Sequence, residues 1–226
     1  MKFKADYDLI VIGSGAAGSA GALMAASAGQ KTAIVEADKW GGSTLNYSDV
    51  PFNALFHATH LLDQAITGAK FGLSSANLRY NYPTINNWKN AAMRRAGAGS
   101  KKIFEEAGIA CFSGLAHFLS PLEISIGNRR LSAKKFLIAT GSQMIDTGIK
   151  IPENLNYLTP ETVLNLIRPP KTLFIVGAGS TGCELAQYFA ELGTKVLIAD
   201  VTGHLLTPLD NYISPFEYNF TAESHS

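Results

Sequence analysis

The sequence has few cysteines, little net charge and no long apolar run. Its two cysteines, Cys111 and Cys183, are too few for a disulfide framework and too far apart to form a redox or ligand pair by spacing. The net charge is +1, without any run of five like charges, so charge gives no reason to expect nucleic acid or an anionic membrane as a partner. The apolar stretch from Ala16 to Ala28 is too short to span a bilayer. These absences favour a cytoplasmic protein in a reducing compartment.

Glycine, by contrast, is plentiful, and its positions repeat along the chain. The sequence reads DLIVIGSGAAG at residues 8–18 and LFIVGAGSTG at residues 173–182. Each segment is an apolar β-branched run that enters a Gly-x-Gly-x-x-Gly turn, and small residues typical of a packed helix follow. The two helical segments end at Gly29 and Gly193. The repeat predicts two copies of one supersecondary unit.

Each repeat closes with a second apolar run that ends in an acid, Glu36 in the first and Asp200 in the second. The interval from the first glycine of the turn to this acid is the same, because 36 − 13 = 23 and 200 − 177 = 23. Two such motifs in a strand–turn–helix–strand context predict two dinucleotide-binding βαβ units. The fold class is therefore α/β with parallel sheets, and 226 residues suffice for two domains of ordinary size.

The residue types in these turns suit the binding of a dinucleotide. The first glycine permits the tight turn, the second lets a pyrophosphate approach the backbone, and the third lets the helix pack against the strand. The helix N-terminus offers free N–H groups to the phosphates, and the acid accepts hydrogen bonds from a ribose diol. Asp200 is followed by Val201 and Thr202 rather than by arginine, which favours NAD over NADP. The predicted glycines are Gly13, Gly15, Gly18, Gly177, Gly179 and Gly182.

The region between the repeats predicts two helices and a small antiparallel sheet. The helices are expected at about 52–69 and 85–107, and the glycine tract 97–100 weakens or kinks the second. The short alternating runs that predict a β-meander lie at 109–112, 115–119, 123–126 and 130–134. The run 136–139 then predicts a strand that returns to the main sheet.

In order and spacing, these motifs resemble those of the pyridine nucleotide-disulfide oxidoreductase family, from about Asp6 to about Ile213. The resemblance implies an FAD-binding domain over 1–148, with Glu36 holding the adenosine ribose, and an incomplete NAD-binding domain over 149–226. The segment 114–118 matches the family's Gly-x-Ala-x-Phe strand, and 139–141 matches its Ala-Thr-Gly turn. The further cofactor-binding positions that the resemblance implies are Gly41, Gly42, Ala116, Thr140, Gly141 and Glu184.

The loop after Glu36 departs from the family pattern at the positions that carry its redox chemistry. The family has two cysteines there, separated by four residues, whereas this chain has Thr44 and Asp49. Neither residue can form a disulfide or a thiolate–flavin pair, which excludes dithiol–disulfide exchange by the family's mechanism. Asn53 stands where the family has a lysine beside the flavin, so Glu184 lacks its usual partner. We therefore assign no catalytic residue.

The resemblance also implies that the chain stops before the segments that complete the NAD-binding domain and form the dimerisation domain, so a truncated family member is expected. Three interpretations stay open. In the first, NADH reduces FAD by hydride transfer, and a small-molecule or protein acceptor takes the electrons without a disulfide. In the second, the chain is a non-catalytic remnant that holds nucleotide weakly or not at all. In the third, it is one half of a split flavoenzyme. The expected partner is a second copy in a homodimer, or a chain that supplies the missing half.

Four other residues have side chains that could suggest a site. Cys183 lies at a predicted helix N-terminus, but its place directly after the last glycine of the turn is a packing position. His57 and His60 are three residues apart without a carboxylate or cysteine at a matching spacing, and His117 alternates along a predicted strand. No metal site is predicted.

Overall fold

The computed structural model describes residues 4–74, 78–144, 148–152, 155–202 and 205–206. The chain forms two compact units, which are described separately. The first comprises residues 1–52 and 90–158, and the second comprises residues 53–89 and 159–226. The segment from residue 207 onward, which includes the end of the family resemblance at Ile213, lies outside the described residues.

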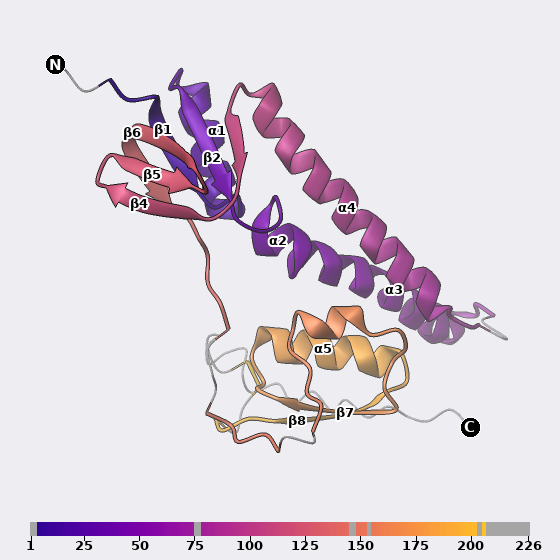
Figure 1. The fold of residues 1–226 in the computed structure, drawn as a ribbon. Helices are drawn as coiled ribbons and strands as arrows, with labels where there is room; N and C mark the ends of the chain where they lie inside the picture. Colours follow the sequence, from indigo (N-terminus) through magenta and orange to yellow (C-terminus); the bar gives the residue numbers. More distant parts are fainter. Residues whose placement is uncertain (1–3, 75–77, 145–147, 153–154, 203–204, 207–226) are drawn as a thin grey trace. The chain divides into compact units, whose positions relative to one another are not determined.

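A six-stranded sheet in the order β3-β2-β1-β6-β5-β4 organises the first unit (Figure 1). Its parallel part consists of β3 (Ala110–Ser113), β2 (Thr32–Glu36), β1 (Tyr7–Ile12) and β6 (Arg129–Ile138). The antiparallel strands β5 (Glu123–Ile126) and β4 (Ala116–Ser120) extend the sheet beyond β6. Every residue of β2 is buried, as expected for a parallel strand that is covered on both faces.

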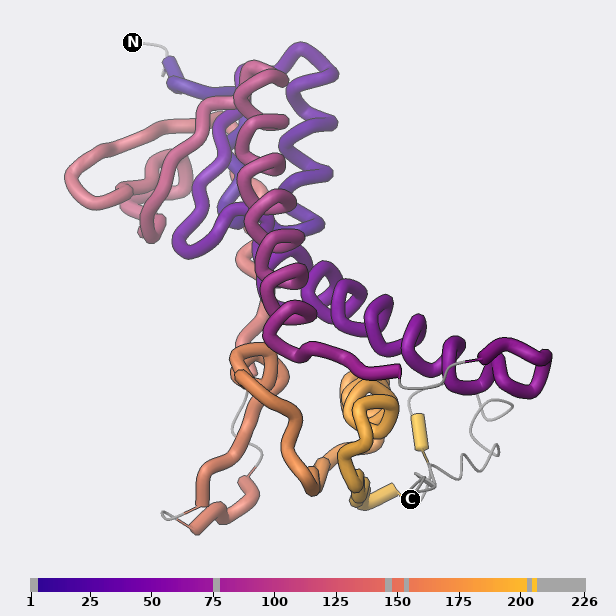
Figure 2. Tube along the Cα trace, turned by 90° about the vertical axis from the view of Figure 1, so that its right-hand side faces the viewer, coloured from indigo at the N-terminus to yellow at the C-terminus, as the bar shows by residue number. Residues whose placement is uncertain are grey.

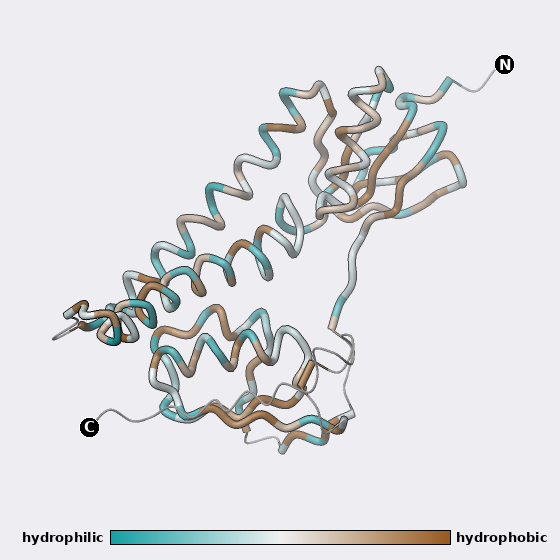
Figure 3. Tube along the Cα trace, turned by 180° about the vertical axis from the view of Figure 1, so that it is seen from behind, coloured by the Kyte–Doolittle hydropathy of each residue, from teal (hydrophilic) through white to brown (hydrophobic). Residues whose placement is uncertain are grey.

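Two apolar layers enclose the parallel strands. On one face, Ile10 of β1 packs in a cluster with residues of β5 and β6, among them Ile124. On the other face, Val11 packs with residues of the helices α1 (Ala16–Ser27) and α4 (Tyr82–Glu106), among them Phe104. Neighbouring residues of one strand therefore reach opposite cores, as the period of two requires. Figure 3 shows the apolar residues concentrated along the strands, while polar and apolar residues alternate along α4.

The sheet differs from the sequence-based prediction in two pairings. The runs 130–134 and 136–139 were expected as separate strands but form one strand, β6. Its first half pairs antiparallel with β5, and its second half pairs in parallel with β1. Two exposed lysines, Lys134 and Lys135, interrupt the apolar pattern of the strand and explain the apparent break. The run 109–112 was expected in the meander, but β3 pairs in parallel with β2.

The second unit is built on a smaller parallel sheet. Strands β7 (Thr172–Val176) and β8 (Lys195–Ala199) pair in parallel, and α5 (Ser180–Glu191) connects them. Residues 53–89 also belong to this unit, and they include most of α3 (Asp49–Thr67). Here the ring of Phe56 meets that of Tyr188 edge-on at 6.0 Å, and the Tyr80 hydroxyl donates to the Leu192 carbonyl at 2.9 Å. Short 3-10 turns, η1 (Gly68–Phe71) and η2 (Thr162–Asn165), complete the described part of the unit.

The helices follow the predictions with shifted ends. α3 begins at Asp49 rather than near residue 52, and α4 begins at Tyr82 rather than near residue 85. The glycine tract 97–100 does not interrupt α4, which Figure 2 shows as one continuous helix. The loop after β2 contains a further short helix, α2 (Gly42–Asn46). Among the described residues, no helix is both long and apolar enough to cross a membrane.

Candidate functional site

The first glycine-rich turn begins where β1 ends. Gly13 adopts a φ of +100°, and its N–H donates to the Val35 carbonyl of β2 at 2.8 Å. A Cβ atom at Gly13 would lie 2.2 Å from the carbonyl oxygen of Ala139, directly after β6. Both the backbone conformation and the space therefore require glycine at this position.

The other two glycines of this turn have opposite surroundings. A Cβ at Gly18 would lie 1.9 Å from the Gly13 carbonyl oxygen, so helix α1 can pack this closely only without a side chain. A Cβ at Gly15 would have no atom within 4 Å. Gly15 is also the N-cap of α1, and no side chain caps the helix there. The backbone N–H groups of the first turn are thus open to an incoming anion, which is the arrangement that a pyrophosphate requires.

The carboxylate of Glu36 lies at the end of β2 and binds the turn. It is 8% exposed and accepts hydrogen bonds from the Ser14 N–H at 2.8 Å, the Ser14 hydroxyl at 2.5 Å and the Asp38 N–H at 2.9 Å. The Ser14 oxygen in turn accepts the Gly41 N–H at 2.9 Å. An ionised carboxylate has about four acceptor positions. Three are occupied, which leaves room for one hydroxyl of a ribose.

The remaining positions predicted for FAD converge on the same edge of the sheet. Gly42 has a φ of +59°, and a Cβ added there would lie 2.7 Å from the Cα of Gly15, so the loop after β2 folds over the turn. The N–H of Gly114 donates to the Glu36 carbonyl at 2.8 Å, which places Ala116, the first residue of β4, beyond the end of β2. Thr140 and Gly141 come two and three residues after the end of β6, and the Cα of Thr140 would lie 3.2 Å from a Cβ at Gly13. The carboxyl ends of parallel strands are where open α/β sheets bind ligands.

The second turn repeats this geometry in the second unit. Gly177 has a φ of +106°, and its N–H donates to the Ala199 carbonyl at 2.8 Å. A Cβ at Gly182 would lie 2.0 Å from the Gly177 carbonyl oxygen, whereas one at Gly179 would have no atom within 4 Å. The Ala178 N–H donates to the carboxylate of Asp200 at 2.6 Å, just as the Ser14 N–H donates to Glu36. The two sequence repeats are therefore also two copies of one hydrogen-bonded turn.

Asp200 is held in its ionised form. The N–H of Ala178, followed by the hydroxyl and N–H of Thr202, lowers the pKa of this carboxyl to about 2. Thr202 donates to it from its hydroxyl at 2.6 Å and from its N–H at 2.9 Å. Asp200 is also exposed, so a ribose hydroxyl can reach it. A fixed negative charge at this point repels a 2′-phosphate.

The residues that depart from the family pattern offer little redox chemistry. Thr44 is half-buried on α2, and Asp49 and Asn53 are exposed on α3. The Asp49 carboxylate accepts a long hydrogen bond from the Ser48 hydroxyl, at 3.4 Å. Glu184 is exposed on α5 and has no ion pair with any residue that the structure describes.

The cysteines and histidines have structural surroundings. Cys111 and Cys183 are free thiols, and burial raises the pKa of both, so they stay protonated at neutral pH. The Cys183 thiol donates to the Ala178 carbonyl at 3.3 Å. His57 packs against a tryptophan ring at 5.8 Å, and His60 shares a hydrogen bond with Gln64. Within the described ranges, no group of three or more potential ligands could hold a metal ion.

Two polar residues that hold these turns were not predicted from the sequence. Ser14 joins Glu36 to Gly41, and Thr202 donates twice to Asp200. A hydroxyl residue between two motif glycines, and another two positions after the acid, are the only sequence signals for these roles. Both signals are weak, because serine and threonine are common in turns.

Comparison with known proteins identifies relatives over almost the whole chain. A family model described as "Pyridine nucleotide-disulphide oxidoreductase" matches residues 7–223. A dihydrolipoyl dehydrogenase from Geobacillus stearothermophilus is 29% identical over 217 residues, which is 94% of this chain and 46% of the relative. A mercuric reductase from Lysinibacillus sphaericus is 30% identical over 92% of this chain and 38% of the relative. A soluble pyridine nucleotide transhydrogenase from a Marinomonas species is 31% identical over 92% and 46%, respectively. The chain thus spans about half the length of the curated relatives it matches.

Solved structures show the same fold. The HOCl-induced flavoprotein disulfide reductase from Escherichia coli matches with a TM-score of 0.72 and 25% identity, over 85% of this chain and 41% of that chain. A copper(II) complex of a mutant of that reductase matches with a TM-score of 0.77 over 92% of this chain and 45% of that chain. At 24% identity, this second match supports the fold alone.

Proposed function

Because the chain belongs to the pyridine nucleotide-disulphide oxidoreductase family, we propose that it is an oxidoreductase that accepts hydride from NADH onto FAD. Members of this family use FAD and NAD(P)H. In this proposal, residues 1–148 form the first segment of the FAD-binding domain, and residues 149–226 form part of the NAD-binding domain. Electrons leave the flavin without a redox-active disulfide, because Thr44 and Asp49 replace the family's cysteine pair.

The shared geometry of the two turns carries this proposal. In each turn, the residue after the first glycine donates its N–H to the acid at the end of the next strand, at 2.8 Å for Glu36 and 2.6 Å for Asp200. In each turn, a Cβ at the second glycine would have open space around it, where a pyrophosphate approaches, whereas one at the third glycine would meet the carbonyl oxygen of the first. A turn that served only to reverse the chain would not require an uncapped helix and an acid in both copies.

The residues of the first unit have defined roles under this proposal. The N–H groups at the start of α1 hold the FAD pyrophosphate, and Glu36 accepts a hydrogen bond from the adenosine ribose. The loop of Gly41 and Gly42 covers the pyrophosphate, and the backbone at Ala116 meets the adenine. Thr140 and Gly141 line the site after β6. When bound, FAD supplies the hydride acceptance and electron transfer that no side chain provides.

The second unit holds the nicotinamide dinucleotide in the same manner. The N–H groups at the start of α5 hold its pyrophosphate, with Gly177, Gly179 and Gly182 shaping the turn. Asp200 accepts a ribose hydroxyl and disfavours a 2′-phosphate, so NADH is preferred to NADPH. Glu184 follows this turn on α5, and the proposal assigns it to the cofactor site.

The proposal also includes a partner chain, a cellular location and an electron acceptor. The expected partner is a second copy of the chain in a homodimer, or a partner chain that supplies further family segments. Two free and separate cysteines favour a reducing, cytoplasmic location. The electron acceptor is a small molecule or a protein.

A second candidate function is the binding of nucleotide without turnover. Thr44, Asp49 and Asn53 depart from the family pattern together, and Glu184 has no ion pair among the described residues. Under this alternative, the two turns keep their geometry and still bind nucleotide, but hydride does not reach the flavin.

Visible absorption spectroscopy separates these functions. The purified chain is titrated with FAD, and NADH or NADPH is then added without oxygen. A bound-flavin spectrum that bleaches faster with NADH than with NADPH supports the proposal. Uptake of FAD without bleaching supports nucleotide binding alone. A chain that takes up no FAD contradicts both assignments of the first unit.

A further inference from the structure

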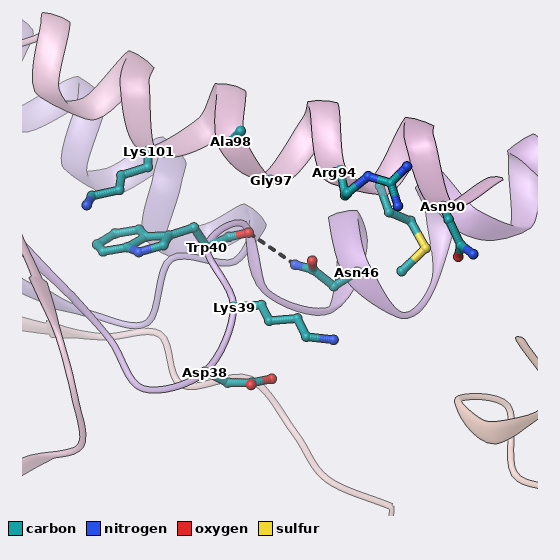
Figure 4. Close-up of a pocket in the computed structure, with 10 residues that line it drawn as sticks. Asp38, Lys39, Trp40, Asn46, Asn90, Arg94, Gly97, Ala98 and Lys101 are labelled. Atoms are coloured by element: carbon teal, nitrogen blue, oxygen red, sulfur yellow. Dashed lines mark hydrogen bonds between the residues drawn. The ribbon is translucent and has the colours of Figure 1, made fainter. Parts of the chain in front are cut away.

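A cavity of about 650 Å³ lies in the first unit, between α4 and the loop that follows β2 (Figure 4). Its wall on the helix comes from one face of α4, with the spacing of three and four residues that places side chains on the same side. These residues are Asn90, Met93, Arg94, Gly97, Ala98 and Lys101. None of the residues assigned to FAD lines the cavity. The cavity is therefore distinct from the turn that we assign to the flavin cofactor.

Small residues on the helix and a fixed loop create this space. Gly97 and Ala98 lie at the middle of the helical face and fill little of it. A Cβ at Gly97 would lie 3.6 Å from the Trp40 carbonyl oxygen, so helix and loop approach closely there. The buried Asn46 amide donates to the carbonyls of Trp40 and Gly42 at 3.0 and 2.9 Å and holds the loop in place. The cavity is thus formed before any ligand arrives.

The charges around the cavity are predominantly positive. Lys39, Arg94 and Lys101 line it, against one carboxylate, that of Asp38. The Asp38 carboxylate already accepts the hydroxyl of Tyr47 at 2.8 Å. Figure 4 shows Lys39 and Arg94 on opposite walls, with Asn46 between them.

The guanidinium of Arg94 is the cation best suited to bind a ligand. It has no ion pair or hydrogen bond with any residue that the structure describes. Lys101 is less free, because its ammonium lies 3.7 Å from Glu105, although both side chains are partly exposed and such a pair is weak. A planar guanidinium without a partner matches the two oxygens of a carboxylate or phosphate.

We propose that this cavity binds an organic anion that has a flat aromatic body and a carboxylate or phosphate group. Arg94 binds the anionic group, with Lys39 and Lys101 flanking it, and the apolar body contacts Met93 and Trp40. The cavity is open to solvent on one side, and its volume falls within the range of about 300–1,000 Å³ that is usual for small-molecule sites. The proposal does not rest on flavin chemistry, because it involves none of the residues assigned to FAD or NADH.

Chemical labelling with pyridoxal 5′-phosphate tests this proposal on the full chain. The probe is an aromatic phosphate whose aldehyde condenses with a lysine amine, loses water and forms an imine, which cyanoborohydride then reduces to a stable adduct. Mass spectrometry of the digested protein gives the labelled fraction of each lysine. We expect Lys39 or Lys101 to be labelled at roughly tenfold lower probe concentration than Lys102.

Lys102 is a stringent internal control. Its side chain is 74% exposed and lies beside Glu106, whereas that of Lys101 is 44% exposed. Simple accessibility therefore predicts more labelling at Lys102, which is the opposite of our expectation. Equal labelling of Lys39, Lys101 and Lys102 would overturn the proposal.

Two variants identify the anion-binding group. Arg94→Gln keeps a long polar side chain but removes the charge, and it should weaken labelling of the cavity lysines roughly tenfold. Arg95→Gln removes a neighbouring exposed charge that does not line the cavity, and it should leave labelling unchanged. An equal effect of the two variants would show that net charge rather than a site attracts the probe, and would overturn the proposal.

Competition distinguishes the possible sources of the anion and separates this site from the flavin site. Protection by 4-nitrophenyl phosphate or by phthalate supports a phosphate or a carboxylate ligand, respectively, whereas protection by neither overturns the proposal.

Labelling should persist in the presence of saturating FAD. If FAD abolished it, the cavity would belong to the flavin site, and the proposal of a separate site would be wrong. Failure of FAD to bind at all would contradict the proposed function and leave this labelling result intact.

Discussion

Gly15 and Gly18 lie three residues apart in one turn, yet an added side chain would meet opposite surroundings. A Cβ at Gly18 would lie 1.9 Å from the backbone oxygen of Gly13, where nothing flexible can move away. A Cβ at Gly15 would meet open space, and the φ of −66° suits any residue. Of these two glycines, the fold therefore requires Gly18, whereas only a ligand would require Gly15.

Alanine substitutions separate these two requirements. Gly18→Ala should destabilise the chain by about 1–3 kcal/mol or more, because the helix must move away from the strand. Gly15→Ala should keep the stability of the apoprotein but weaken FAD binding roughly tenfold, because its methyl group occupies the approach of the pyrophosphate. Urea unfolding followed by circular dichroism measures the first effect, and FAD titration measures the second. A large loss of apoprotein stability in Gly15→Ala would contradict this division.

At the scale of secondary-structure elements, sequence patterns predicted the local units and only part of the pairing between distant strands. Each βαβ unit lies within about thirty residues, so glycine spacing and apolar periodicity were enough to locate β1, α1 and β2. The run 136–139 was predicted to return to the main sheet, and residues 136–138 do pair with β1. That the same strand extends back to Ala133, which pairs with Tyr7, was not predicted, because no local pattern reports such a contact. The role of Ser14 was missed for the same reason, because its partner Gly41 lies 27 residues away.

The glycine tract in α4 illustrates how the fold overrides local propensity. Gly97 and Gly99 are poor helix formers, yet the helix continues from Tyr82 to Glu106. The apolar contact of Phe104 with the core on one face of the sheet fixes the C-terminal part of this helix. Tertiary packing therefore supplies the stability that the sequence of the tract lacks.

Gly99→Ala should stabilise the first unit by about 0.5–1 kcal/mol. Gly99 lies inside α4, and a Cβ there would have no atom within 4 Å, so the only effect is the gain in helix propensity. Gly108 is the matched control, because it follows the same helix but has a φ of +72°, which strains any other residue. Gly108→Ala should therefore destabilise the chain. Urea unfolding measures both variants, and shifts of the same sign would contradict the argument.

At the scale of the whole molecule, the proposed route of the electrons does not pass through either of the two thiols. Cys111 lies in β3 of the first unit, and Cys183 lies in α5 of the second. Burial raises the pKa of both thiols, and their nearest hydrogen-bond partners are backbone carbonyls. With Thr44 and Asp49 at the positions of the family's cysteine pair, the proposed reaction passes electrons from the flavin directly to an acceptor.

A chain without cysteines should therefore keep the proposed reaction. In the Cys111→Ser, Cys183→Ser double variant, each hydroxyl can replace the thiol as a donor to the nearby carbonyl, so the fold should be retained. NADH should bleach the bound flavin at the rate found for the unmodified chain, and neither protein should develop the long-wavelength band of a thiolate–flavin pair. Stopped-flow absorption without oxygen measures both properties, and FAD titration confirms that the variant still binds flavin. If the variant bound FAD but was no longer reduced by NADH, a thiol would take part in electron transfer, and the direct route would be wrong.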